Sequence, residues 1–327
     1  MGRILGLVGA VILAGGCAEE SAPFPLPAAP ACAVPAAARV LHEGFDCATG
    51  WLAVDDAHVY WREMSLLDGS ESVLAGGRCG GGTTRVGPAL GSLRTADGML
   101  YGIDGTSLFA VPVDGRAPVA IATGFASLFG LAADPTDGTA ILVSSADCSG
   151  AAGCAHPGTA WRIHRTGGEA RSLLPASPDA TIDALAVAPD GSFWVNGVVG
   201  HTSGIFHLDH DGAPLEQLAR AEGVDQLLTD PVTGQLFARS AEGILVHEGD
   251  GLRNVWPVPA GGVRSFALDG RYLYAVTVDG KLSRRSRAGG DVTVLLEGDV
   301  IAVGLDAASV YALDCRFSVG RILQLAR

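Results

Sequence analysis

Short apolar runs alternate with polar turns along most of this chain. The stretch "DDAHVYW" (55–61) places two acids before a β-branched residue and two aromatics. Six other stretches repeat this arrangement, each with a turn rich in Asp, Gly, Ser or Thr before a short apolar strand. They are ADGMLYGI (96–103), TDGTAILV (136–143), PDGSFWV (189–195), VTGQLFA (232–238), DGRYLYAV (269–276) and DAASVYAL (306–313). The repetition favours ordinary turn residues at Asp55 and Asp56 over a metal-binding loop.

One large apolar position marks the strand in each copy. These anchors are Tyr60, Tyr101, Leu142, Trp194, Phe237, Tyr274 and Tyr311. They lie 37 to 52 residues apart, and a period in this range is typical of propeller blades. We expect Trp194 and the neighbouring Trp61 to pack between blades rather than to stack on a ligand.

Each copy belongs to a longer unit of four short strands, which we name A to D. An apolar run precedes the turn, as in residues 265–268, and two further strands follow the anchor, as in residues 204–219. Apart from the N-terminal segment, no stretch shows a 3.6-residue apolar period over the length of a helix. Seven four-stranded units predict an all-β fold, a seven-bladed β-propeller, whereas a β-sandwich does not require seven equal copies.

The two ends of the chain predict how the ring closes. Residues 320–327 match strand C of a unit that lacks its strand D, and residues 38–44 match a lone strand D. We therefore expect residues 39–44 to pair with the last blade, which would protect an otherwise exposed sheet edge.

The repeat resembles that of propeller lipoproteins of myxobacterial type. The matching segments are "LAVDDAHVYW", "GIFHLDHDGA" and "SRRSRAGGDVTVLLEGD", similar to AVDxxxVYW repeats followed by an Arg and a Gly-Gly pair. The resemblance covers nearly the whole chain after the N-terminal segment and implies a propeller without specifying a function. Blade 1 departs from the pattern after Trp61, and blade 3 departs through an insertion at 145–158.

The N-terminus predicts export. The first 16 residues hold one Arg and an apolar run from Ile4 to Ala14 that is short for a membrane span. The Gly-Gly-Cys ending resembles a bacterial lipobox, which predicts lipidation of Cys17. Plain secretion with Cys17 removed and a buried N-terminal helix are the alternatives. Proline-rich residues 17–38 then form a tether, followed by a single domain at 39–327. The expected location is the bacterial cell envelope, on the periplasmic face or the cell surface.

Composition narrows the class of partner. The 327 residues include 46 Gly, only 17% are charged, and the formal net charge is −13. Such a chain forms a turn-rich globular domain. Nucleic-acid binding requires clustered Lys and Arg, so we expect no nucleic-acid partner and contact with the membrane only through the lipid.

If Cys17 is lipidated, six cysteines remain, and an even number in an exported protein indicates disulfides. Cys148 and Cys154 flank a five-residue segment of the blade 3 insertion and would form a local bridge. Cys32, Cys47, Cys79 and Cys315 allow three connectivities, with Cys315 expected in a loop of the last blade. We expect these bridges to staple blades 1 and 7, without an order of pairing. The spacing gives no support for a zinc site.

The central channel is the best candidate for a binding site. One equivalent position lies just before each strand A, which is innermost in a propeller. These positions are Gly50, Gly91, Phe129, Asp183, Asp225, Arg264 and Ile301. Blades 4 to 6 thus bring Asp183, Asp225 and Arg264 to one mouth, where converging charges suit a ligand or cation. The alternative is an Arg264 salt bridge that only closes the ring.

No established catalytic motif is present in the sequence, and we expect neither a cofactor nor a catalytic residue. The segment "HLDHDG" (207–212) is shorter than an EF-hand loop and lacks its distal Glu, so a tight hairpin turn is expected there. We expect a binding or scaffold module for an unidentified protein or small molecule. The rivals are a propeller enzyme of lactonase or lyase type and a subunit of a surface complex, which fold alone does not separate.

Overall fold

A computed structural model describes twelve segments of the chain. They are residues 37–65, 68–88, 90–96, 98–112, 116–125, 127–137, 140–145, 159–174, 180–218, 223–258, 262–316 and 319–327, with only the backbone at 48–50, 140 and 141. All of them belong to one unit of the fold, residues 31–327. Every regular element in these segments is a β-strand, and they contain no helix long and apolar enough to cross a bilayer. The predicted signal peptide, Cys17, Cys32, Cys148 and Cys154 lie outside the described residues.

The strands group into seven blades, and blades 1 to 6 each have strands A to D in chain order. The strand β1 (Arg39–Val54) serves two of them. Blade 1 holds the second half of β1, β2 (His58–Met64), β3 (Glu71–Gly77) and β4 (Thr83–Pro88). Blade 2 holds β5 (Leu93–Ala96), β6 (Met99–Asp104), β7 (Ser107–Val111) and β8 (Val119–Thr123). Blade 3 holds β9 (Leu128–Ala133), β10 (Ala140–Ser145), β11 (Ala160–His164) and β12 (Arg171–Leu174).

Blades 4 to 6 follow the same order, whereas blade 7 takes its strand D from the N-terminus. Blade 4 holds β13 (Thr181–Val187), β14 (Phe193–Val199), β15 (Thr202–Leu208) and β16 (Pro214–Leu218). Blade 5 holds β17 (Gln226–Thr229), β18 (Leu236–Ser240), β19 (Gly243–Glu248) and β20 (Gly251–Pro257). Blade 6 holds β21 (Val263–Leu268), β22 (Tyr272–Thr277), β23 (Lys281–Ser286) and β24 (Thr293–Glu297). Blade 7 holds β25 (Val300–Leu305), β26 (Ser309–Arg316), β27 (Val319–Ala326) and the first half of β1.

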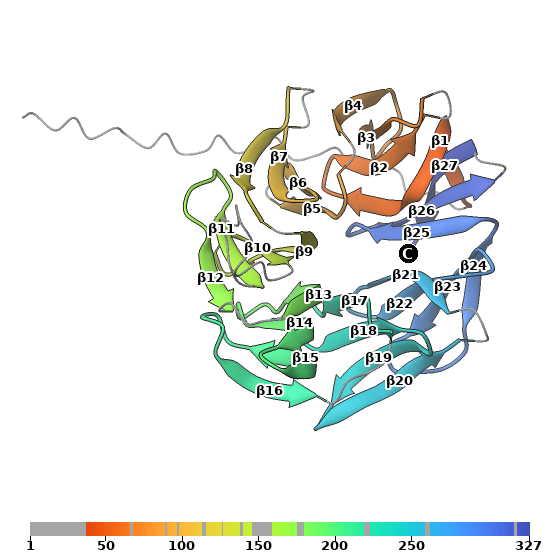
Figure 1. Cartoon of the computed structure of the whole chain (residues 1–327). Helices are drawn as coiled ribbons and strands as arrows, with labels where there is room; N and C mark the ends of the chain where they lie inside the picture. The colour runs from red at the N-terminus through yellow and green to blue at the C-terminus, as the bar shows by residue number, and fades with distance from the viewer. Residues whose placement is uncertain are drawn as a thin grey trace, which may run out of the picture. The chain divides into compact units, whose positions relative to one another are not determined.

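The blades surround a common centre, which confirms the predicted propeller. Figure 1 shows the A strands β5, β9, β13, β17, β21 and β25 innermost, and β8, β12, β16, β20 and β24 at the periphery. Blades 2 to 6 are separate antiparallel sheets of four strands. Their hydrophobic clusters lie between successive blades, so that each blade buries both faces against its neighbours.

The anchor of every blade is buried in strand B, as the repeat predicts. The exposed fraction of the seven anchors is at most 3%. The turn between strands A and B explains why tyrosine suits this position. In blade 7, Oδ1 of Asp306 accepts hydrogen bonds from the backbone N–H groups of Ala308 and Ser309, both at 2.7 Å. Its Oδ2 accepts one from the Tyr311 hydroxyl, also at 2.7 Å. The anchor therefore packs an apolar ring in the core and still satisfies its hydroxyl.

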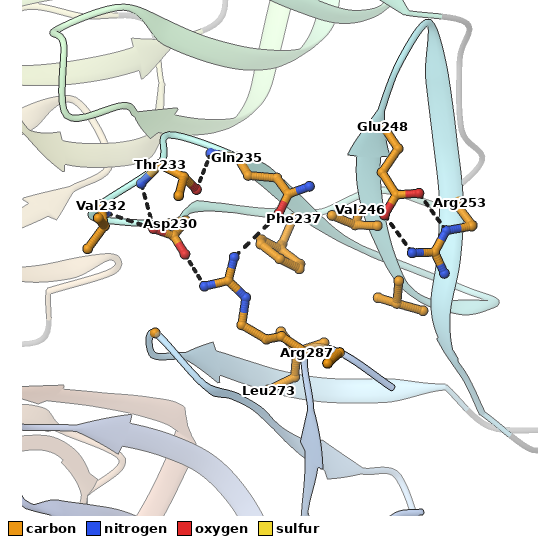
Figure 2. A pocket seen from close by; sticks show the side chains of 13 residues that line it. Asp230, Val232, Thr233, Gln235, Phe237, Val246, Glu248, Arg253, Leu273 and Arg287 are labelled. Carbon is orange, nitrogen blue, oxygen red and sulfur yellow. Dashed lines mark hydrogen bonds and ion pairs between the residues drawn. The ribbon is translucent and has the colours of Figure 1, made fainter. Parts of the chain in front are cut away.

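The same carboxylate joins neighbouring blades. In three successive junctions an arginine that directly follows strand C of one blade forms an ion pair with the turn aspartate of the preceding blade. These pairs, the blade latches, are Arg287 with Asp230, Arg327 with Asp269, and Arg78 with Asp306. Figure 2 shows Arg287 reaching from blade 6 to Asp230 of blade 5. The turn Asp of the sequence repeat and an Arg just after strand C thus hold adjacent blades together at these three junctions.

Blades 7 and 1 meet at a seam formed by β1. The first half of β1 pairs with β27 from Arg39 opposite Gln324 to Asp46 opposite Val319. After an irregularity that follows Cys47, the same strand pairs with β2 as strand A of blade 1. Closure of the last blade by the N-terminal strand is therefore confirmed. The two blades form one continuous seven-stranded sheet, whereas the other blades are separate sheets.

A disulfide fixes the same seam. Cys47 in β1 is bonded to Cys315 in β26, with 5.8 Å between their Cα atoms. Sequence alone left three connectivities open for this group of cysteines. Cys315 lies within strand B of blade 7, not in the loop expected from the sequence, because β26 extends to Arg316. Cys79 is also disulfide-bonded, and its partner is not among the described residues.

Candidate functional site

All seven A strands line one central cavity of about 610 Å³. Its wall alternates between apolar side chains such as Leu93 and Phe266 and polar ones such as Gln226 and Thr229. Because the strands run roughly parallel around the centre, residues at the start of each strand A gather at one mouth of this channel. We call this mouth the rim.

Bulges in strand A direct side chains into the channel at the rim. The register of β13 with β14 shifts between Ile182 and Ala184, which leaves Asp183 as an extra, exposed residue. The register of β21 with β22 shifts in the same way around Arg264. A bulged residue is unpaired and its side chain is re-aimed. The backbone therefore explains why these predicted positions face the channel rather than the blades.

The three predicted rim residues line the same cavity, and two of them form ion pairs with residues outside the predicted set. Nε of Arg239 lies 2.6 Å from Oδ1 of Asp225, within blade 5. Nη1 of Arg264 lies 3.6 Å from Oδ1 of Asp299, in the segment that leads to blade 7. The carboxylates of Asp225 and Asp299 are exposed, so these ion pairs contribute little stability. The sequence prediction missed Arg239 and Asp299, which lie in strand B of blade 5 and before β25.

A third arginine lies deeper in the channel. Arg94 in β5 is opposite the anchor Tyr101, three residues further along strand A than the rim position of its blade. At this level the other blades carry Ala53, Ala132, Ala186, Leu228, Ala267 and Gly304. Enclosure by protein lowers the pKa of the Arg94 guanidinium. The sequence prediction missed Arg94, although a charged residue stands there where the other repeats have small or apolar ones.

Trp61, Trp194 and His207 have structural roles. Trp194 is 3% exposed and Trp61 is fully buried, which confirms that both belong to the core. The His207 ring stacks on Trp194 with 4.1 Å between ring centroids, and its Nε2 lies 2.9 Å from the Ser192 hydroxyl. Burial lowers the pKa of His207. In the described segments, no three His, Cys, Asp or Glu side chains are placed to hold a metal ion.

The segment 207–212 is a hairpin turn, as expected. Oδ1 of Asp209 accepts hydrogen bonds from the backbone N–H groups of Asp211 and Ala213, at 2.9 and 2.8 Å. The backbone N–H of Gly212 in turn donates to the Asp209 carbonyl. These bonds use the Asp209 carboxylate for the turn itself.

A second hollow of about 460 Å³ lies between blades 5 and 6 (Figure 2). Its polar groups are engaged with one another. The Arg287 guanidinium lies over the Phe237 ring, 5.0 Å from its centroid, and pairs with Asp230. On the other side, Arg253 donates to both carboxylate oxygens of Glu248. The hollow therefore surrounds a blade latch, and the channel remains the better binding site.

Known proteins resemble this chain in fold only. Neither a protein-family model nor a curated protein matches it. The WD40 β-propeller domain of Doa1 matches with a TM-score of 0.60 and 13% identity, over 88% of this chain and 96% of that one. BamB from Moraxella catarrhalis matches with 0.53 and 14%, over 86% and 84%. A chain of a nidogen/laminin complex matches with 0.50 and 17%, over 67% and 86%. Identities this low show the propeller fold and no activity.

Proposed function

We propose that this chain is an exported, lipid-anchored β-propeller that acts as a binding or scaffold module at the bacterial cell envelope. The disulfide between Cys47 and Cys315 carries the proposal, because disulfides persist in oxidising compartments outside the cytoplasm. The N-terminal apolar run and the lipobox-like ending at Cys17 support the same location. The repeat also resembles that of myxobacterial-type propeller lipoproteins.

The rim is the proposed contact for a partner. Asp183, Asp225 and Arg264 present both signs of charge around the mouth of one cavity. Mixed, exposed charges suit the recognition of a polar partner more than catalysis, which would need unengaged acids or a buried base. The Asp225 carboxylate is held by Arg239, and this weakens the alternative of a lactonase- or lyase-type enzyme with acidic metal ligands.

Palmitate labelling tests the lipid anchor at Cys17. Cells of a bacterial host that express the full chain should incorporate labelled palmitate into it, and the Cys17→Ala variant should not be labelled. Fractionation should place the unaltered chain with membranes and the variant in the soluble envelope fraction. Equal labelling of both proteins, or recovery of the unaltered chain from the cytoplasm, would refute the proposal.

Metal analysis separates binding from the enzyme alternative. The purified chain should contain no stoichiometric divalent metal, and the Asp183→Asn variant should match it. A bound metal that is lost in Asp183→Asn would favour the enzyme.

A further inference from the structure

We propose that Arg94 is an anion-binding residue, and that the central channel takes a small molecule carrying a carboxylate or phosphate group. This proposal gives a ligand class to the binding module described above. The two proposals can be tested separately, because palmitate labelling examines only the lipid anchor.

The contacts of Arg94 leave its charge uncompensated. Nη1 donates to the backbone carbonyl of Leu93 at 2.9 Å, and among the described residues no carboxylate forms an ion pair with Arg94. The other channel arginines, Arg239 and Arg264, have Asp225 and Asp299. A guanidinium carries five N–H donors. Most of the donors of Arg94 are therefore available to a ligand.

The surroundings of Arg94 favour an anion over water. Four of the small or apolar residues at its level, Ala53, Leu228, Ala267 and Gly304, also line the cavity. Arg94 lies about 10 Å along the strand from the rim position, since three residues of a strand span about that distance. Protein encloses much of its side chain, and this enclosure lowers its pKa. A charge in such a poorly solvated place attracts an opposite charge more strongly than one at the surface does.

The position of Arg94 in the repeat makes a structural role a poor explanation. Six blades pack this level with a residue no larger than Leu. An enclosed cation without a partner costs stability, and the ring closes at the other six positions without one. The chain as a whole has a net charge of −13, so most of its surface repels anions. The Arg94 guanidinium inside the channel attracts them.

Anion titration tests the proposal on the full chain with Cys17→Ala, which leaves the propeller unaltered. The thermal midpoint is followed at constant ionic strength with inorganic phosphate and, separately, with benzoate. We expect at least one probe to raise the midpoint of the Arg94-containing protein with increasing concentration. Arg94→Gln should weaken the apparent affinity by about tenfold or more. Arg253→Ala, which removes an exposed arginine of the outer strand β20, should keep the response. The two probes distinguish a phosphate ligand from a carboxylate ligand.

Two outcomes would overturn the proposal. One is an equal response of Arg94→Gln and Arg253→Ala, which would place the anion elsewhere. The other is no response to either probe in the Arg94-containing protein. Arg94→Met provides a further readout, because loss of an uncompensated charge should leave the midpoint in anion-free buffer unchanged or raise it. A lower midpoint in Arg94→Met would show that Arg94 holds the fold together instead.

Discussion

The seam between blades 7 and 1 and the junction between blades 5 and 6 are held in different ways. Both have the same blade latch, Arg78 with Asp306 at the seam and Arg287 with Asp230 at the junction. The seam adds a strand shared by both blades and the Cys47–Cys315 bridge. The peptide chain already connects blades 5 and 6, so only the seam must hold two distant parts of the chain together. The latch therefore also occurs where the chain is continuous, and the strand and the disulfide are additions for closure.

Removal of the shared strand should have the largest effect. Without residues 18–45 the chain loses the pairing of β1 with β27 and the buried ring of Phe45. We expect a loss of unfolding free energy of about 5 kcal/mol or more, which is comparable to the total stability of many domains. A chain that lacks only residues 18–31 is the control and should melt like the parent in a circular dichroism experiment. Equal melting of the two deletions would contradict closure by this strand.

Loss of a latch should cost nearly as much in both places, and slightly more at the seam, where Asp306 also accepts a hydrogen bond from Tyr311. Asp306→Ala and Asp230→Ala each leave an arginine beside a vacated, buried carboxylate site and two unsatisfied backbone N–H groups. Breaking one side of a buried pair costs about 3–5 kcal/mol. Urea denaturation should give that value for both variants. Asp225→Ala at the rim is the matched control and should lose less than about 1 kcal/mol, since its pair is exposed. A much larger loss at the seam than at the junction would show that the latches are not equivalent.

The disulfide should contribute somewhat less. The double variant Cys47→Ser with Cys315→Ser should lose about 2–4 kcal/mol, because the bridge limits the freedom of the unfolded chain. Its two cysteines are 268 residues apart. Denaturation with and without reductant provides the measurement, and the double variant should respond less to reductant than the parent. A variant as stable as the parent would mean that the shared strand alone closes the ring.

The smallest effect concerns pH. His42 lies in the shared strand, is 5% exposed and stacks on Trp61, with its Nε2 3.1 Å from the Gly77 carbonyl. Burial lowers the pKa of His42, although the hydrogen bond to Gly77 opposes the shift. The unfolded chain then binds a proton as the pH falls below 6.5 while the folded chain does not, so stability declines in that range. Urea denaturation at a series of pH values should show this decline. His42→Gln should flatten this part of the stability curve, and an unchanged slope would refute the assignment.

The sequence predicted most of the fold because the fold repeats. Seven anchors at similar spacing establish the blades, and the unmatched strands at the two ends establish the closure. The sequence did not predict the latches, although the turn Asp belongs to the repeat, because the contact between the two residues depends on how far one blade is offset from the next. Asp306 and Arg78 are 228 residues apart, and only the closed ring brings them together.

The candidate site was less predictable for a related reason. The rim residues line one cavity, but the partners of Asp225 and Arg264 lie in strand B of blade 5 and in the segment between blades 6 and 7. Arg239 and Asp299 lie outside the aligned position and could not be found by aligning it. Arg94 could have been found, because a charged residue stands where the other blades have only small or apolar ones. A repeat thus identifies a functional position best where one copy departs from the others.

The direction of β1 has a mechanical consequence. The chain enters the propeller at Arg39, on the outer edge of blade 7, and runs inward to Cys47. A pull on Arg39 is therefore transmitted first to the hydrogen bonds between β1 and β27. It then meets the covalent bond to Cys315, which bears the load before it reaches the first A strand. A force applied at the N-terminal end of β1 would therefore reach the strands that line the channel last.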